Sequence, residues 1–484
     1  MNYEPIICFE THVELKTETK LFCDCLVRYD APPNTHICPV CTGQPGALPV
    51  LNKKAVEYAV KAGVALNCTI NQKSRFARKN YFYPDLPKGY QISQYERPFC
   101  EDGYLEITGD DGRPYAVGIK RIHLEEDAGK LVHSSDSFDE ADYSLVDYNR
   151  SCIPLIEIVC DHYRNPIRSV LEAKTYLEKL KQVLRYINIS DCNMEMGQLR
   201  CDVNISLRPK GSDEFGNRVE IKNMASFRFI AEALEYEITR QTELLDQDQT
   251  ILQETRLFDE SKKITLPMRS KEDAPDYRYF PDPDLLDVHI DDFFLQSIKK
   301  SLPELPDQKA NRMITEYGIS QSDALILTRD RPISEFFGEC APLCRDKKRL
   351  SHWIIKELFK LLNDTSTSIR ECPIQPRDMS DLMNLMSDGA ITDTIGRTVL
   401  EEMFQDGGSP QDIIHQRGLQ PIQDKQELEA IIQQVIDENP DAITQIKAGQ
   451  TKPVDFLIGQ VMKKTRGKAD PKKIRNVIQD RFYN

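Results

Sequence analysis

The stretch Gln198-Leu-Arg-Cys-Asp-Val-Asn-Ile-Ser-Leu-Arg208 alternates between apolar and polar side chains almost without a fault. A period of two is typical of a β-strand that turns one face toward a hydrophobic core. The polar face offers the carboxylate of Asp202 between the guanidinium groups of Arg200 and Arg208. This combination suits a metal-bound polyphosphate better than the loose mixture of charges on an ordinary outer strand.

Three further segments, 7–15, 119–127 and 219–223, repeat the alternation. Four such strands would gather one set of polar side chains on a single sheet face: Glu10, His12, Glu125, Asp202 and Glu220, with Arg200 and Lys222 beside them. The alternative is a solvated face crossed by salt bridges, which is the usual meaning of any one such strand. Four acidic strands together favour a nucleotide–magnesium site, because like charges brought together must be neutralised.

A helix is expected directly after the strand at 219–223, with Ser226 as its N-cap. The free N–H groups at its start would face the same site and suit phosphate. We therefore expect four residues to contact the phosphates of a nucleotide: Arg200, Lys222, Asn223 and Ser226. Another helix is predicted to start at Asn165-Pro166, because an apolar stripe at helical spacing follows it.

The chain has 484 residues, which is too long for one hydrophobic core and predicts two to four domains. A formal net charge of −14 argues against a protein that simply coats nucleic acid. No apolar run of about eighteen residues occurs, and the N-terminus lacks the basic and hydrophobic stretches of a signal peptide. We expect a soluble, cytoplasmic protein without a membrane partner.

Strand and helix patterns alternate in the first part of the chain, and helical periodicity takes over afterwards. We expect an α+β fold with a large N-terminal domain of strands and helices, residues 1–293. An all-α middle domain, residues 294–405, and a small helical tail domain, residues 406–484, are expected to follow.

Fourteen cysteines are present, and most are scattered singly among apolar positions. Four are organised as two close pairs: Cys23, Cys25, Cys38 and Cys41. Four thiolates satisfy tetrahedral Zn²⁺, so the segment 23–41 predicts a structural zinc knuckle without an open coordination position. The alternative is four free thiols, since a first pair spaced by a single residue is less usual.

The end of the chain is basic although the whole is acidic. We expect one group of residues to bind the phosphate backbone of a nucleic acid: Lys463, Lys464, Arg466, Lys468, Lys472 and Lys473. On charge alone, the polar side of a solvated helix explains these residues equally well.

Several long motifs resemble one known family, the B subunits of aspartyl/glutamyl-tRNA amidotransferases. The motifs span essentially the whole chain: Phe76–Gln94, His123–Gly129, Leu145–Arg150, Glu220–Asn223, Asp276–Asp284, Phe456–Met462 and Gly467–Pro471. The resemblance implies that the first domain is a catalytic cradle built on an antiparallel sheet, similar to the core shared by glutamine synthetase and guanidino kinases. It also implies a tail domain that contacts tRNA.

The resemblance further implies ATP-dependent phosphorylation of the side-chain carboxylate of Glu-tRNA(Gln) or Asp-tRNA(Asn), followed by displacement of phosphate by ammonia. In that family Mg²⁺ and ATP bind the sheet, and Glu10, His12 and Glu125 match the motifs that form the magnesium site. Asp202 and Glu220 join this catalytic set on strand geometry alone. Met196-Gly-Gln198 departs from the family pattern, so residues 196 and 198 are not assigned to the site.

The chain has no Walker-type phosphate loop and no segment of an amidase. Ammonia must then come from partners, which the resemblance identifies as an amidase A subunit and a small C subunit in a heterotrimer. We expect Lys79, Asp85 and Lys88 to line part of the ammonia path toward Glu125. Two other functions stay open: a free-standing ATP-dependent ligase of a small carboxylate, and a non-catalytic, zinc-stabilised tRNA-binding subunit.

Overall fold

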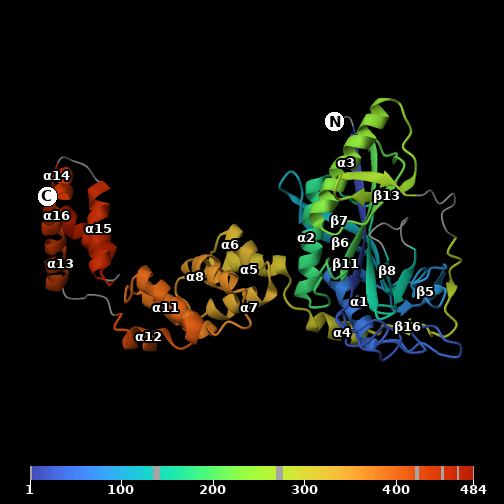
Figure 1. Cartoon of the computed structure of the whole chain (residues 1–484), viewed down its shortest axis with the longest axis horizontal. Helices are drawn as coiled ribbons and strands as arrows, with labels where there is room; N and C mark the ends of the chain where they lie inside the picture. The colour runs from blue at the N-terminus through green and yellow to red at the C-terminus, as the bar shows by residue number, and fades with distance from the viewer. Residues whose placement is uncertain are drawn as a thin grey trace. The chain divides into compact units, whose positions relative to one another are not determined.

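A computed structural model describes residues 3–134, 142–268, 276–419, 425–447, 452–465 and 468–482. The chain divides into two compact units, Met1–Leu305 and Pro306–Asn484. The first contains the strands and the second is helical (Figure 1). The coarse prediction of a sheet domain followed by helices is thereby confirmed.

The first unit is built on a nine-stranded sheet in the order β14-β13-β12-β11-β1-β10-β7-β6-β2. All neighbours pair antiparallel except β12 and β13, which run parallel. Its strands are β1 (Tyr3–Glu14), β2 (Thr69–Ile70), β6 (Cys100–Thr108), β7 (Pro114–Glu126), β10 (Pro154–Cys160), β11 (Leu199–Pro209), β12 (Val219–Lys222), β13 (Glu254–Asp259) and β14 (Ile264–Pro267).

One face of this sheet is apolar and packs under helices, as the alternation predicted. The helices of the unit are α1 (Lys53–Ala65), α2 (Val170–Tyr186), α3 (Phe227–Asp246) and α4 (Asp292–Ser301). The ring of Phe9 on β1 stacks on Tyr176 of α2 with 5.8 Å between centroids. Val203 and Ile205 of β11 are fully buried in the same core. The opposite face is therefore left to the polar side chains.

The helix predicted at Asn165-Pro166 begins later, at Val170, so that prediction was wrong by about one turn. Asn165 has a left-handed φ of 51°, which no helix continues. The following Ile167 is held by β1, because its carbonyl accepts the N–H of Ile7 at 2.9 Å. Ser169 then caps the helix by accepting the N–H of Glu172. The prediction that Ser226 caps α3 is confirmed, since its hydroxyl accepts the N–H of Phe229.

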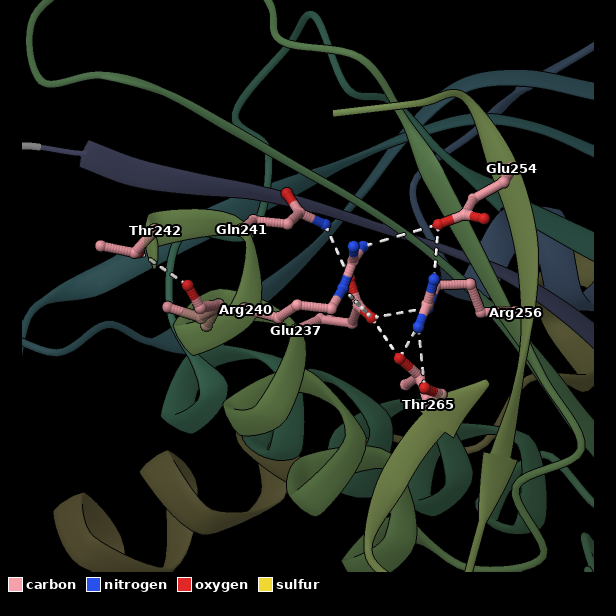
Figure 2. A network of polar contacts seen from close by, with 8 residues as sticks. Glu237, Arg240, Gln241, Thr242, Glu254, Arg256 and Thr265 are labelled. Atoms are coloured by element: carbon pink, nitrogen blue, oxygen red, sulfur yellow. Dashed lines mark hydrogen bonds and ion pairs between the residues drawn. The ribbon is translucent and has the colours of Figure 1, made fainter. Parts of the chain in front are cut away.

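Smaller sheets surround the rim of the polar face. They comprise a three-stranded sheet, β15-β4-β5, and two two-stranded sheets, β16-β3 and β8-β9. Their bounds are β3 (Lys73–Ser74), β4 (Ala77–Asn80), β5 (Tyr90–Ser93), β8 (Lys130–His133), β9 (Ser144–Asp147), β15 (Phe280–Pro281) and β16 (Val288–His289). Far from the rim, a polar network ties α3 to β13 and β14 (Figure 2).

The second unit contains two hydrophobic clusters, one between Ala310 and Ile414 and one between Leu428 and Ile478. Its helices are α5 (Pro306–Tyr317), α6 (Gln321–Leu327), α7 (Arg331–Cys340), α8 (Lys347–Trp353) continuing as a π-helical turn η2 (Ile354–Leu358) into α9 (Phe359–Thr365), α10 (Pro376–Ser387), α11 (Asp393–Asp406), α12 (Pro410–Gln416), α13 (Lys425–Glu438), α14 (Pro440–Lys447), α15 (Lys452–Lys464) and α16 (Pro471–Phe482).

The buried cores extend past the two domain boundaries that were expected from sequence. The sequence put the first boundary after residue 293, whereas Ile298 of α4 is buried in the core of the sheet unit, which runs to Leu305. Likewise α12 supplies Ile413 and Ile414 to the middle cluster, although it follows residue 405.

Candidate functional site

The strand register aligns the polar side chains of the exposed sheet face in rows. His12 of β1 stands opposite Arg200 of β11 on one side and Glu157 of β10 on the other. Glu157 in turn stands opposite His123 of β7. Since side chains alternate between faces, these four residues point the same way and form one row across four strands.

Glu125 lies two residues beyond His123 on β7, on the same face, and its carboxylate reaches this row. We call His12, His123, Glu125 and Glu157 the acid–histidine cluster. The Nε2 atom of His123 lies 3.1 Å from Glu157 Oε2 and 3.3 Å from Glu125 Oε2. The Nε2 atom of His12 lies 3.5 Å from Glu157 Oε2 and 3.6 Å from Glu125 Oε1. His123 and Glu125 are buried, whereas a quarter of the His12 side chain is exposed, so the cluster opens on the His12 side.

The electrostatics of the cluster favour ionised carboxylates. Burial alone would raise the pKa of Glu157, but the charges and hydrogen bonds of His123 and His12 hold that pKa well below its usual range. The pKa of Glu125 is lowered in the same way, against burial, by His123 and His12. The ionised forms of Glu125 and Glu157 are therefore stabilised by positive charge placed between the two side chains.

A divalent cation fits this ligand set. One ligand atom each from His12, Glu125 and Glu157 can be chosen so that all lie within 4.8 Å of one another. Two carboxylates and one imidazole leave the remaining positions of an octahedral Mg²⁺ for phosphate oxygens and water. The magnesium ligands predicted from sequence included Glu10 in place of Glu157.

Glu10 lies in the neighbouring row, opposite Asp202 of β11. Its Oε1 accepts a hydrogen bond from Asn204 Nδ2 at 3.0 Å, and it is not among the three grouped ligands. Glu157 was missed because β10 does not alternate and reads as a buried strand. The available signal was that Glu157 is the one charged residue in the run Ile153–Cys160.

The other acidic residues of the predicted set already have partners within the chain. Lys222 Nζ lies 3.0 Å from Asp202 Oδ2 and 3.1 Å from Glu220 Oε1. Thr255 donates its hydroxyl to Glu220 at 2.7 Å. Asp202 and Glu220 thus form a paired group beside the cluster and do not share in its ligand set.

Of the predicted phosphate contacts, Arg200 lies closest to the cluster by register, and its Nη2 pairs with Asp127 Oδ2 at 2.9 Å. Asn223 is exposed and has a left-handed φ of 67°. The Ser226 hydroxyl is used to cap α3.

Arg121 of β7 lies in the alternating segment 119–127 but was not among the site residues predicted from sequence. Its Nε atom is buried and has no hydrogen-bond partner among the described residues. A buried N–H without a partner is costly, so this guanidinium suits an anionic ligand.

Lys79 of β4 also faces the acid–histidine cluster. Burial would lower its pKa, but Glu125, Tyr279 and Glu157 raise it, so the ammonium stays charged. Its Nζ lies 4.7 Å from the centroid of the Tyr277 ring. The other residues predicted on the ammonia path lie in the next loop.

Lys88 Nζ contacts both carboxylate oxygens of Glu126 at 2.5 Å. The carbonyl of Asp85 accepts the N–H of Gly129 at 2.8 Å. Glu126 follows Glu125 directly and its side chain lies on the other face of β7, so Lys88 does not reach the cluster through it.

The four predicted cysteines come together, with one Sγ from each within 4.8 Å of the others. The Sγ atoms of Cys38 and Cys41 are 3.9 Å apart. A tetrahedral Zn²⁺ with Zn–S bonds of about 2.3 Å requires sulfurs about 3.8 Å apart, so the group has the dimensions of a zinc site. The fully buried Lys20 places its Nζ 3.6 Å from Cys41 Sγ. A buried ammonium is satisfied by a thiolate much better than by a neutral thiol.

The basic residues of the tail lie on and between its last two helices. Lys463 and Lys464 are exposed at the end of α15, and Lys464 pairs with Glu438 at 2.6 Å. Lys468 lies between the helices, and Lys472 and Lys473 are in the first turn of α16. Arg466 falls outside the described residues. No described helix combines the length and apolar character needed to cross a membrane.

Comparisons with known proteins place the chain in a family. Residues 5–296 match a family described as the GatB/GatE catalytic domain, and residues 335–482 match one described as the GatB domain. The curated B subunit of the aspartyl/glutamyl-tRNA(Asn/Gln) amidotransferase of Carboxydothermus hydrogenoformans is 51% identical over 480 residues, covering 99% of both chains.

Proteins of the same name from Thermodesulfovibrio yellowstonii and Persephonella marina are 50% and 49% identical, again over 99% of both chains. Identity of this extent over the full length shows the family. The chain therefore belongs to the family of aspartyl/glutamyl-tRNA(Asn/Gln) amidotransferase B subunits.

Proposed function

We propose that the chain is the ATP-dependent subunit of a tRNA-dependent amidotransferase and that the acid–histidine cluster is its phosphoryl-transfer centre. The observation that carries the proposal is the placement of two carboxylates, the buried Glu125 and the partly buried Glu157, beside two histidines. Family membership supplies the reaction, since the relatives are named for aspartyl/glutamyl-tRNA(Asn/Gln). The substrate is then Glu on tRNA(Gln) or Asp on tRNA(Asn).

In the proposed reaction, an oxygen of the substrate side-chain carboxylate attacks the γ-phosphorus of ATP and ADP leaves. Ammonia then attacks the acyl carbon, phosphate leaves, and the amide is formed. His12, Glu125 and Glu157 would hold Mg²⁺, whose positive charge would offset the negative charge of the phosphates. The guanidinium of Arg121 orients phosphate oxygens, since its buried Nε is free to donate.

Lys79 has a separate role in this proposal. Its ammonium lies among Tyr rings and is drawn by Glu125 and Glu157, where it can position the substrate carboxylate or the incoming ammonia. Ammonia would arrive from an amidase A subunit assembled with a small C subunit. The path past Asp85 and Lys88 stays a proposal, because both already contact neighbouring groups.

The segment 23–41 is proposed to bind one structural Zn²⁺ through its four cysteines. The sulfur spacing and the buried ammonium of Lys20 support it. We also propose that the sheet unit is similar to the core shared by glutamine synthetase and guanidino kinases.

The decisive experiment measures ATP hydrolysis by the chain assembled with its amidase partners. Addition of Glu-tRNA(Gln) or Asp-tRNA(Asn) should stimulate hydrolysis, whereas correctly charged Gln-tRNA(Gln) and free glutamate should not. Stimulation by free glutamate would support the free-standing ligase. Binding of mischarged tRNA without ATP hydrolysis would support a non-catalytic tRNA-binding subunit.

A further inference from the structure

A fifth cysteine, Cys152, lies beside the four-cysteine group. Its main-chain carbonyl accepts the N–H of Leu21 at 2.8 Å, two residues before Cys23. The thiol of Cys152 is a hydrogen-bond partner of the Cys23 thiol. Cys152 does not belong to the set of four sulfurs that all lie within 4.8 Å of one another, so it stands next to that set on the Cys23 side. The group therefore has one more thiol at hand than a tetrahedral zinc ion uses.

The loop that carries the fifth cysteine packs against the cysteine segment through further hydrogen bonds. Ser151 donates its hydroxyl to the carbonyl of Cys41 at 3.2 Å. The carbonyl of Tyr148 accepts a hydrogen bond from Nζ of the buried Lys20 at 3.1 Å. These contacts hold the fifth thiol at a fixed place beside the group.

The backbone of Cys152 is strained. Its φ is 71°, in the left-handed region that glycine adopts freely and side chains with a Cβ disfavour. Strained positions of this kind persist where the surrounding structure holds them, and they are frequent at functional sites. A thiol kept in such a conformation next to four other thiols is a candidate for chemistry with them.

Cys23 and Cys152 differ in their access to solvent. Cys23 is partly exposed, whereas Cys152 is completely buried. The thiolate is the nucleophilic form of cysteine and is also the form that binds zinc. A small oxidant from solvent therefore meets Cys23 first, and Cys152 is placed to react with the oxidised sulfur from the buried side.

We propose that Cys152 is the resolving thiol of a peroxide-sensitive zinc site. Hydrogen peroxide oxidises the Cys23 thiolate to a sulfenic acid, and hydroxide leaves. The Cys152 thiol then attacks the sulfenic sulfur, a disulfide forms and water leaves. One peroxide thus accepts the electron pair that the two thiols lose. Zinc keeps only three of its four thiolates and is released. This inference rests on the zinc site that is part of the proposed function.

The same loop contacts the strand that carries Glu125. The N–H of Cys152 donates to the carbonyl of Asp127 at 2.8 Å, and Asp127 directly follows β7. Arg150 of the loop lies 3.4 Å from Asp127 Oδ2. Oxidation should therefore lower the rate of amide formation in addition to releasing zinc.

The test exposes the full chain, assembled with its partner subunits, to hydrogen peroxide. Zinc release is followed with a chromogenic chelator, and disulfide partners are identified by mass spectrometry of peptides after alkylation of free thiols. We expect the release of about one zinc per chain, together with a pair of peptides linked through Cys23 and Cys152. A thiol reductant with added zinc should restore both the bound metal and the rate of amide formation.

The decisive variant is Cys152→Gly, which removes the thiol and suits the left-handed backbone, so zinc content and activity without peroxide should be retained. Peroxide should then release zinc several-fold more slowly and produce no link to Cys23. The matched control is Cys192→Gly, because Cys192 is also completely buried, has a left-handed φ of 53° and lies outside the four-cysteine group. It should respond to peroxide as the unchanged chain does.

Two results would overturn the proposal: zinc release from Cys152→Gly at the unchanged rate, or oxidised protein in which Cys152 keeps a free thiol. Retention of zinc by protein that carries the linked pair would overturn it as well. The zinc content before oxidation tests the zinc site separately. If the purified chain holds no zinc, the zinc site fails and the peroxide-sensitive site fails with it, while the proposed phosphoryl-transfer centre stands.

Discussion

Glu157 is held by both imidazoles of the acid–histidine cluster, which makes it the best-supported ligand on the sheet. Its Oε2 lies within 3.5 Å of both His12 and His123 Nε2. Glu10, by comparison, accepts from Asn204, and burial together with Glu157, Glu220 and Asp202 raises its pKa. A carboxyl group with a raised pKa gives up its proton less readily to bind a metal.

We predict that Glu157→Gln lowers the rate of ATP-dependent amide formation at least 100-fold or so. Losing one anionic ligand should remove charge stabilisation of roughly several kcal/mol in the transition state. Rates are measured with mischarged tRNA across a magnesium titration, and we expect Glu125→Gln and His12→Ala to behave alike. The matched control is Glu106→Gln, an exposed residue on β6. Near-normal activity of Glu157→Gln with unchanged magnesium dependence would contradict the assignment.

A second prediction concerns Lys79, whose ammonium faces Glu125 and Glu157. If it guides ammonia, Lys79→Met should impair amidation driven by glutamine several-fold more than amidation supplied with external ammonium. Lys54→Met, which alters an exposed ion pair with Glu57 on α1, serves as control. Equal losses in both assays would instead assign Lys79 to the phosphoryl-transfer step.

The sequence predicted which side chains point to the polar sheet face where strands alternate, as for His12 and Glu125. The orientation of side chains on β10 could not be predicted in this way, because a strand buried on both faces shows no period of two. Nor could spacing reveal that Asp202 and Glu220 share Lys222, since that pairing depends on the register of β11 and β12.

Among the secondary-structure elements, α3 is anchored to β13 and β14 by a polar network that the sequence did not reveal. The buried Glu237 accepts hydrogen bonds from Arg240 at 2.8 Å and from Gln241 at 3.0 Å, and pairs with Arg256 at 3.1 Å (Figure 2). Arg256 also donates to Thr265 at 2.7 Å. Glu237 lies on the buried side of α3, and its partners on β13 and β14 are 19 and 28 residues away.

We predict that Glu237→Gln destabilises the protein by about 3–5 kcal/mol, because it leaves two arginines without their buried anion. Burial alone would raise the pKa of Glu237, but hydrogen bonds from Arg240, Thr265 and Gln241 lower it. Its contribution to stability is therefore present above its ordinary pKa of 4.5 and lost as the pH falls below that value.

The midpoint of thermal unfolding, measured from pH 7 to pH 3, should thus differ most between wild type and Glu237→Gln at neutral pH and least in acid. Glu235→Gln, an exposed site on the same helix, should track wild type throughout. A difference in unfolding midpoint between wild type and Glu237→Gln that stays constant with pH would show that Glu237 contributes no charge-dependent stability.

The cysteine segment lacks regular secondary structure over most of its length, so we expect a bound zinc ion to contribute to its stability. Purified protein should contain about one zinc per chain by elemental analysis. Replacing Cys38 and Cys41 together by Ser should remove it and lower the unfolding midpoint. Cys68→Ser, a cysteine outside the group, should keep the metal. Native protein without zinc and with four titratable thiols at these positions would restore the free-thiol interpretation.

At the scale of the whole molecule, charge is distributed unevenly along an acidic chain. The net charge is −14, yet residues 461–484 hold eight Lys or Arg against two Asp.

The sequence indicated the order of sheet and helical parts correctly, because periodicity changes along the chain. Periodicity does not fix the exact domain boundaries, because a helix such as α12 belongs to the core that buries Ile413 and Ile414, and the helical pattern does not show which core that is.

The last prediction uses those cores to design a truncation. Ending the chain after residue 419 removes the cluster built from Leu428 to Ile478 but keeps α12 within the middle cluster. If the tail docks the phosphate backbone of tRNA, the Michaelis constant for mischarged tRNA should rise about tenfold or more. Its dependence on salt concentration should flatten at the same time, because fewer counterions are released on binding.

Glutamine hydrolysis by the partner subunit, assayed without tRNA, is the control and should be nearly unchanged, since the tail is assigned no chemistry. A charge reversal tests the same idea without deletion: Lys463→Glu and Lys473→Glu alter two exposed side chains on α15 and α16. Both should raise the Michaelis constant while leaving the maximal rate intact, because phosphate contacts position a substrate and take no part in the bond changes. Unchanged affinity for tRNA across salt concentrations in the truncated and reversed proteins would mean that the basic residues only solvate a helix surface.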